Sequence, residues 1–179
     1  MHEVGNMIIE GARVKLLPIS EDDTKNIVKW RNHVRSQFLD RRLFTDESHN
    51  NWLHTMVETG KVAQFVIEID GNDKIGSVFL RDIDRKNKKA EFGIFIGEDR
   101  YQGKGYGTEA AGLILEYGFR QLGLHKITLR VLEKNKRAIR SYEKAGFKKE
   151  GCFVDDVFVD DQYENIIYMA IFEKQKETD

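Results

Sequence analysis

The stretch "DRYQGKGYGTEAAGLILEYGF" (residues 99–119) places glycines at three alternate positions, Gly103, Gly105 and Gly107, immediately before a helical pattern. Apolar and small residues then recur at helical spacing: Ala111, Ile114, Leu115, Gly118 and Leu122. Glycine is costly in regular structure, so its repetition predicts a place where a bare backbone is needed. A strand that enters a glycine loop and then a helix is typical of an anion site, because the first helical N–H groups lack partners.

Two common phosphate loops do not fit this spacing. In a Walker loop, four residues separate the first glycine from a Gly-Lys pair, and a hydroxyl residue follows. Here Gly97 is one residue too far from the pair, and Gly105 stands where the hydroxyl residue belongs. The dinucleotide pattern G-x-G-x-x-G fails at its third glycine, where the chain has Thr108. A glycine-rich surface turn is the remaining alternative.

The composition predicts one soluble domain over residues 1–179. Hydrophobic residues make up 40% of the chain and the net charge is −1, so no overall field attracts nucleic acid or an anionic membrane. The lone Cys152 excludes a disulfide framework, and we expect no metal site. The opening "MHEVGNM" is unlike a signal peptide, and no apolar run is long enough to span a membrane. A cytoplasmic location is expected.

The pattern of elements predicts an α/β (α+β) fold with a mixed, mostly antiparallel sheet. Helices are expected over residues 21–32, 44–59, 108–122 and 135–147, the second with Asp46 or Ser48 as its N-cap. Strands are expected at residues 7–19, 63–70, 74–84, 90–97 and 125–133, with two more within 152–172. We divide the domain into an acceptor-side part (1–62), a core (63–173) and a frayed tail (174–179).

Two segments carry a resemblance to a known family. "RYQGKGYGT" (residues 100–108) resembles the [QR]-x-x-G-x-[GA] motif of the GNAT superfamily of N-acetyltransferases. "HKITLRVLEKNKRAIRSYEKAGFKKEG" (residues 125–151) is similar to that family's second conserved stretch, in which an asparagine opens a helix and a tyrosine precedes "xKxGF". The resemblance extends from about Phe65 onward. "WRN" (residues 30–32) and "FVDDQYENIIYMAI" (residues 158–171) are typical of the branch that contains ribosomal-protein, spermidine and nucleotide-amino-sugar N-acetyltransferases.

The resemblance implies acetyl-CoA as cosubstrate, with no metal. Strands 90–97 and 125–133 would splay apart, and the pantetheine arm would lie between them. The implied cofactor-binding residues are Phe95, Ile96, Gly97, Arg100, Gly103, Lys104, Gly105, Tyr106, Gly107, Thr108, Asn135 and Arg137. An amine would attack the thioester directly, with a backbone N–H near residues 94–96 donating to the developing oxyanion.

Tyr142 and Glu91 are the expected catalytic residues. The family places its acid at the position of Tyr142, and a phenol keeps its proton at neutral pH. Tyr142 could equally be a core residue of its helix. Glu91 is the candidate base, with an exposed partner of nearby lysines as the alternative; a histidine of the first two helices could also serve. Asn135 suits an N-cap as well as a cofactor contact.

The acceptor is expected to be a small-molecule amine that contacts Trp30, Arg31 and Glu91. The arginines from Arg31 to Arg42 favour an anionic acceptor such as a nucleotide-linked amino sugar. Acidic residues between Asp155 and Glu164 could instead attract a polyamine or a protein N-terminus. A non-catalytic acyl-CoA sensor and an unrelated nucleotide-binding protein are the rival classes. Exposed edge strands are compatible with a homodimer.

Overall fold

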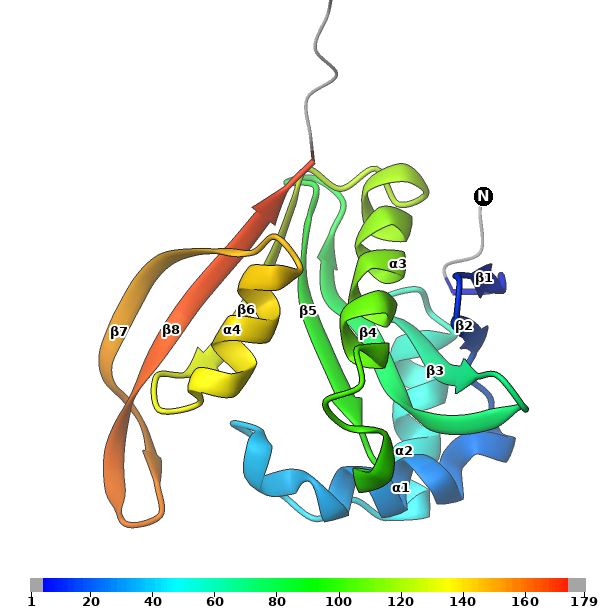
Figure 1. The fold of residues 1–179 in the computed structure, drawn as a ribbon, viewed down its shortest axis with the longest axis horizontal. Helices are drawn as coiled ribbons and strands as arrows, with labels where there is room; N and C mark the ends of the chain where they lie inside the picture. The colour runs from blue at the N-terminus through cyan, green and yellow to red at the C-terminus, as the bar shows by residue number, and fades with distance from the viewer. Residues whose placement is uncertain (1–4, 174–179) are drawn as a thin grey trace, which may run out of the picture.

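The structure, a computed structural model, describes residues 5–173 and contains one mixed sheet of eight strands. The order across the sheet is β1-β2-β3-β4-β5-β6-β8-β7 (Figure 1). The strands are β1 (Ile9–Glu10), β2 (Val14–Pro18), β3 (Ala63–Ile69), β4 (Asp73–Asp84), β5 (Lys89–Ile96), β6 (Lys126–Leu132), β7 (Lys148–Val159) and β8 (Gln162–Phe172). The mixed, mostly antiparallel sheet predicted from the sequence is confirmed. The predicted tail at 174–179 lies outside the described residues.

The single parallel pair, β5 with β6, is the place where the sheet opens. Their register runs only from Lys89–Lys126 to Glu91–Thr128, although both strands continue well beyond it. From Phe92 onward, β5 therefore has no strand partner on its β6 side, while it stays paired with β4 on the other. The predicted splay between these two strands is present.

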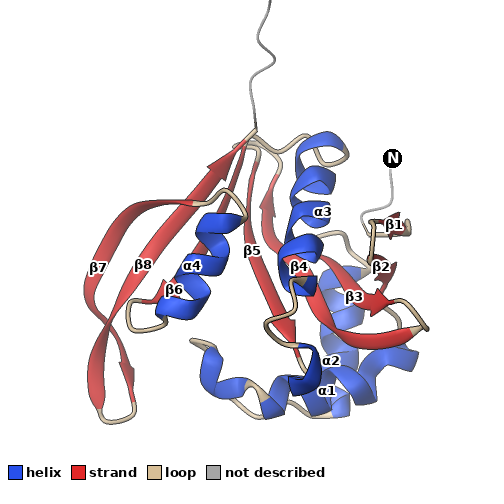
Figure 2. Ribbon diagram, viewed as in Figure 1, coloured by secondary structure: helices blue, strands red, loops and turns tan. Residues whose placement is uncertain are grey.

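The helices lie on both faces of the sheet (Figure 2). They are α1 (Thr24–His33), α2 (Asp46–Trp52), α3 (Tyr106–Arg120) and α4 (Lys136–Lys144), with the short turns η1 (Glu21–Asp23), η2 (Arg35–Gln37), η3 (Leu53–Val57) and η4 (Asp99–Tyr101). Buried residues of α3 join the large core with Phe65 and Phe92, and α4 packs against the same core. Trp30 of α1 joins a second, smaller core with Val66 and Phe95. Because Phe65 and Val66 are adjacent in β3, these two cores occupy opposite faces.

The second predicted helix differs from its expected form. Its N-cap is Thr45, whose side chain accepts a hydrogen bond from the Ser48 N–H, so the choice of Asp46 or Ser48 as cap was wrong. Ser48 completes the cap by accepting from the Thr45 N–H with its own hydroxyl. The α-helix ends at Trp52 and continues as a π-helical turn, η3, rather than as one regular helix.

Over residues 5–173, the chain forms no helix with the length and apolar character needed to cross a membrane. The same part of the chain brings together no group of three or more His, Cys, Asp or Glu side chains able to hold a metal ion.

Candidate active site

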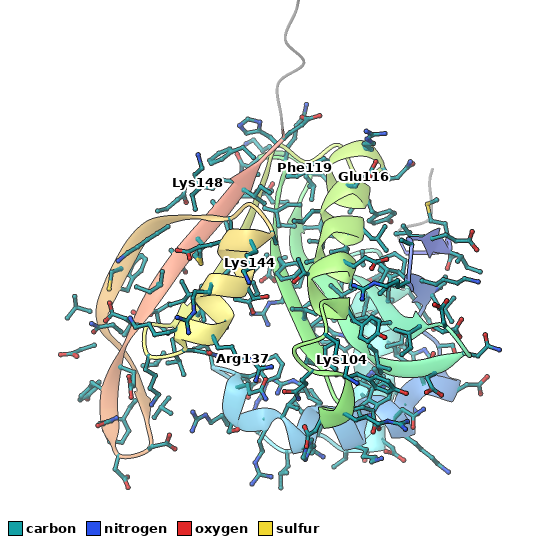
Figure 3. The ribbon with its side chains drawn as sticks, in the orientation of Figure 1. Lys104, Glu116, Phe119, Arg137, Lys144 and Lys148 are labelled. Atoms are coloured by element: carbon teal, nitrogen blue, oxygen red, sulfur yellow. The ribbon has the colours of Figure 1, made fainter. Side chains whose placement is uncertain are left out.

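A cleft of about 590 Å³ lies where β5 leaves β6, within the size range of small-molecule sites. It is bounded by β5, the loop before α3, the start of α3 and one side of α4. The predicted residues that line it are Phe95, Ile96, Gly103, Gly105, Gly107, Thr108, Asn135, Arg137 and Tyr142. Figure 3 shows Arg137 and Lys104 approaching the cleft from its two sides. Eight of the predicted cofactor residues and the predicted acid are thus brought together.

The glycine loop turns β5 into α3 by using left-handed backbone conformations. Gly103 has a φ of 73° and Gly105, the N-cap of α3, has a φ of 88°. Residues with a side chain rarely adopt these angles, so the first two glycines meet a backbone requirement. At Gly107 a Cβ would meet only Ile94 and Ile96, at ordinary contact distances of 3.8 Å, but it would project into the cleft. The loop therefore leaves the N-terminal N–H groups of α3 open to an anion.

The remaining four predicted cofactor residues lie outside the cleft lining. Arg100 stacks on the Tyr101 ring at 4.6 Å, and its guanidinium is 3.8 Å from Asp73. Lys104 accepts a hydrogen bond at its carbonyl from Arg13, and that arginine also covers the Tyr106 ring. Direct cofactor contact by these side chains stays a prediction.

Gly97, the last of the four, has a packing role. An added Cβ would fall 2.1 Å from the Trp30 ring, so only glycine lets β5 pass over that tryptophan. Trp30 itself is 2% exposed and donates its indole N–H to Glu98 at 2.8 Å. This hydrogen bond lowers the pKa of Glu98. Contact between Trp30 and the acceptor stays a prediction, and its surroundings weigh against it, because its ring is buried beneath the end of β5.

Tyr142 projects from α4 into the inner end of the cleft. Its ring packs edge-on against Phe92 and Phe147, with centroids 6.0 Å and 6.1 Å away. No protein group within residues 5–173 hydrogen-bonds to its hydroxyl, and burial raises the pKa of Tyr142 to about 12. The side chain is therefore neutral at physiological pH, and its ring packing fixes the position of a hydroxyl that keeps its proton.

The first turn of α4 is fixed by Asn135, which both caps the helix and lines the cleft. Its side-chain oxygen accepts a hydrogen bond from the Ala138 N–H at 3.1 Å, so the capping role is present. Beyond it, Arg137, Arg140 and Lys144 all line the cleft. Sequence reasoning missed Arg140 and Lys144, although the spacing 137–140–144 places them on one helix face. Three cations and a helix N-terminus suit the phosphates of acetyl-CoA.

Glu91 lies near the point of divergence, on the face of β5 that is opposite α3 and α4. Its Oε1 accepts hydrogen bonds from Arg81 at 2.6 Å and from Arg130 at 3.2 Å. The Glu91 side chain is 16% exposed. Sequence alone offered Lys88 and Lys89 as partners, but the register of β4, β5 and β6 places two arginines beside it instead.

Two of the acidic residues that could attract a cationic acceptor have cationic partners within the chain. Asp160 pairs with Arg41 at 2.7 Å, and Glu164 pairs with Lys134. The histidines of the first two helices do not line the cleft: His33 pairs with Asp99 on the surface, and His49 is 2% exposed. These arrangements leave the acidic hairpin with less free charge than the sequence indicated.

Comparisons with known proteins agree with this geometry. The acetyltransferase (GNAT) domain matches residues 13–148. Spermidine N(1)-acetyltransferase of Escherichia coli K12 is 37% identical over 168 residues, covering 90% of this chain and 87% of the relative. The Vibrio cholerae enzyme of the same name is 34% identical over 73% of this chain and 72% of its own length.

Solved structures show the same architecture. The crystal structure of spermidine N-acetyltransferase from Vibrio cholerae in complex with CoA and spermine superposes with a TM-score of 0.82 at 26% identity, covering 90% of this chain and 96% of that one. A GNAT-family acetyltransferase from Bacillus anthracis, 24% identical, has the same fold with a TM-score of 0.78 and covers 93% of this chain and 98% of its own. The chain belongs to the GNAT family of acetyltransferases, and the enzyme class predicted from its two motifs, an acetyl-CoA-dependent N-acetyltransferase, is confirmed.

Proposed function

We propose that this enzyme transfers the acetyl group of acetyl-CoA directly to the primary amine of a small molecule. The observation that carries the proposal is one cleft that joins the glycine loop, at Gly103 to Thr108, to the hydroxyl of Tyr142, which has no hydrogen-bond partner within residues 5–173. The loop and the cations of α4 suit the phosphate end of the cosubstrate, and the tyrosine suits the thioester end.

The unpaired side of β5 supports the middle of this arrangement. Backbone groups of residues 92–96 have no strand partner towards β6, so they can pair with the amides of the pantetheine arm. An N–H of residues 94–96 in the same stretch can donate to the oxygen that gains negative charge as the amine attacks. A backbone donor held by the β4–β5 ladder is already oriented before the reaction begins.

Two proton transfers complete the proposed reaction. Tyr142 gives its proton to the departing thiolate, since its hydroxyl is neutral and open to the cleft. Glu91 as the base that deprotonates the amine stays a prediction, and its surroundings weigh against it. Two guanidinium groups already share its charge, so accepting a proton would cost those ion pairs.

The identity of the acceptor has less direct support than the reaction. The relatives named above act on spermidine, which makes a polyamine the first acceptor to test. None of them is named for a nucleotide-linked amino sugar, the acceptor favoured by sequence, and the only observation left for it is the set of arginines near the cleft. The cytoplasmic location and the homodimer stay predictions.

Free-thiol release from acetyl-CoA by the purified protein tests the proposal. The amines would be spermidine, a nucleotide-linked amino sugar and a peptide with a free N-terminus. We expect amine-dependent release with at least one small molecule. Release no faster than hydrolysis with every small amine, despite an increase in melting temperature on adding acetyl-CoA, would favour the non-catalytic sensor.

A further inference from the structure

Three arginines gather on the sheet face opposite α3 and α4: Arg31 from α1, Arg81 from β4 and Arg130 from β6. We call them the arginine cluster. Two members of the cluster, Arg81 and Arg130, donate hydrogen bonds to the Glu91 carboxylate. Asp82 lies 3.9 Å from the Arg81 Nε and the charge of Asp40 acts on Arg31, so the cluster is distinguished by donors that lack acceptors rather than by an excess of charge.

Arg31 is the member without a carboxylate partner. Its Nη2 donates to the Asp40 carbonyl oxygen at 2.9 Å, and its guanidinium stacks on the Phe38 ring at 3.5 Å. The Asp40 carboxylate is engaged by Arg42 at 2.7 Å. Burial lowers the pKa of Arg31 to about 10, and the charge of Arg81 contributes to that shift, so these two guanidinium groups are close enough to repel each other.

Two donors of the cluster are buried without an acceptor. Within residues 5–173, three buried side-chain polar atoms lack a hydrogen-bond partner, and two of them are Nη1 of Arg31 and Nε of Arg81. The nearest carboxylate oxygen recorded for the Arg81 Nε belongs to Asp82, at 3.9 Å, which is too long for a hydrogen bond. Buried donors without partners are uncommon and costly, so two in one cluster call for a ligand.

The arginine cluster adjoins the cleft. The Phe38 ring, which stacks on Arg31, meets Phe95 edge-on with centroids 5.9 Å apart, and Phe95 lines the cleft. Phe95 and Glu91 lie on the same face of β5, because their positions along the strand differ by four, an even number. Arg81 and Arg130 each keep 35% of their side chains exposed, so a solute entering from this face can reach them.

We infer that the arginine cluster is a subsite for an anionic group, a carboxylate or a phosphate, on the acceptor amine. Guanidinium groups bind both anions through paired N–H donors, and such an anion would supply the acceptors that Arg31 and Arg81 lack. A polyamine carries no such group and would leave these two donors without an acceptor. The inference rests on the proposed function, since it names the acceptor class for the same reaction.

Matched amines with and without an anion test this subsite. The pairs would be glucosamine 6-phosphate against glucosamine, and lysine against cadaverine, with spermidine as reference. We expect kcat/KM to be about tenfold higher or more for the anionic member, the usual effect of one charged hydrogen bond. Arg31→Gln and Arg81→Gln should remove that preference while leaving the KM for acetyl-CoA unchanged.

Arg35→Gln is the matched control, because Arg35 is exposed and lies one turn beyond Arg31. It should keep the preference. Arg31→Lys retains the positive charge without the planar fork of the guanidinium group. Thermal melts would show whether each variant remains folded, and the two results together separate loss of the subsite from loss of folding. Equal rates within both pairs, or spermidine exceeding every anionic amine, would overturn the subsite and leave the proposed transferase intact.

Calorimetry keeps the subsite and the reaction distinguishable. Glucosamine 6-phosphate would be titrated into the CoA-bound enzyme and into its Arg31→Gln variant. Binding that depends on Arg31, with no transfer to any amine, would support the subsite and count against the proposed function. Absence of binding in both proteins would overturn the subsite.

Discussion

At the scale of single residues, Tyr142 combines a buried ring with a hydroxyl that no described protein group holds. Tyr142→Phe removes only that hydroxyl. We expect kcat to fall by about 10²-fold or more, the usual contribution of general acid catalysis, while acetyl-CoA affinity and thermal stability stay near wild type. Steady-state kinetics and calorimetry would measure these quantities. An unchanged kcat would exclude Tyr142 as the acid.

Tyr117 provides the matched control for that substitution. It is 5% exposed in the same core, and its hydroxyl accepts a hydrogen bond from the Gly5 N–H at 2.8 Å. Tyr117→Phe should therefore lower the free energy of unfolding by about 1 kcal/mol and leave kcat unchanged. The two variants separate a tyrosine that holds structure from one that serves the cleft.

The role of Glu91 is tested by the pH dependence of kcat/KM rather than by a rate at one pH. In Glu91→Gln the side-chain oxygen can still accept from Arg81, so the local packing is kept. Because Glu91 already forms ion pairs with Arg81 and Arg130, we expect a structural role, with a loss in kcat/KM of less than about tenfold and an unchanged acidic limb. Disappearance of that limb in the variant would instead establish Glu91 as the base.

At the scale of elements, the β1–β2 hairpin holds the glycine loop in place. Arg13 donates from Nη1 to the Lys104 carbonyl at 3.3 Å and pairs with Glu109 of α3 at 3.2 Å. Glu109 Oε1 also accepts from the backbone N–H groups of Arg13 and Val14. A segment that the sequence assigned to the acceptor side thus supports the glycine-loop end of the cleft.

Removing this support should weaken cosubstrate binding. We expect Arg13→Ala to raise the KM for acetyl-CoA at least about threefold, with little change in kcat, since one partly exposed ion pair and one backbone contact are lost. Lys15→Ala, two residues further along the chain and 3.8 Å from Glu10, is the control and should have no effect. A KM for Arg13→Ala equal to that of wild type would show that the glycine loop keeps its conformation without this contact.

The contact between α1 and α2 should make the fold sensitive to acid. The Thr24 hydroxyl donates to Asn50 at 2.6 Å, so His49 Nδ1, 3.0 Å from the Thr24 oxygen, must carry the hydrogen. Its other nitrogen, Nε2, is buried and has no hydrogen-bond partner among residues 5–173, and burial lowers the pKa of His49 from 6.5. Below pH 6.5 the unfolded chain therefore takes up a proton that the folded chain resists.

Stability should consequently decrease as the pH falls below this value. We expect Tm to drop between about pH 7.5 and about pH 5.5, and His49→Gln to flatten that dependence. His33→Gln serves as the control because His33 is exposed and pairs with Asp99. A Tm profile that is the same in wild type and His49→Gln would contradict the assignment.

At the scale of the whole molecule, the predictable features are those set by neighbours in sequence. The glycine loop, the Asn135 cap and the succession of helices and strands along the chain depend on short patterns. The environments of Trp30 and Glu91 depend instead on partners from distant strands. Trp30 is buried because β5 crosses it at Gly97, and Glu91 is paired because β4 and β6 flank it. No local pattern contains that information.

The most direct measurement follows both products of one reaction: free CoA thiol, and acetylated amine detected by mass spectrometry. It would use wild-type enzyme and Tyr142→Phe with spermidine, glucosamine and glucosamine 6-phosphate. We predict that thiol and acetylated amine form in equal amounts with at least one amine, and that both fall together in the variant. Thiol release without an acetylated amine, or no release with any of them, would contradict direct acetyl transfer in this cleft.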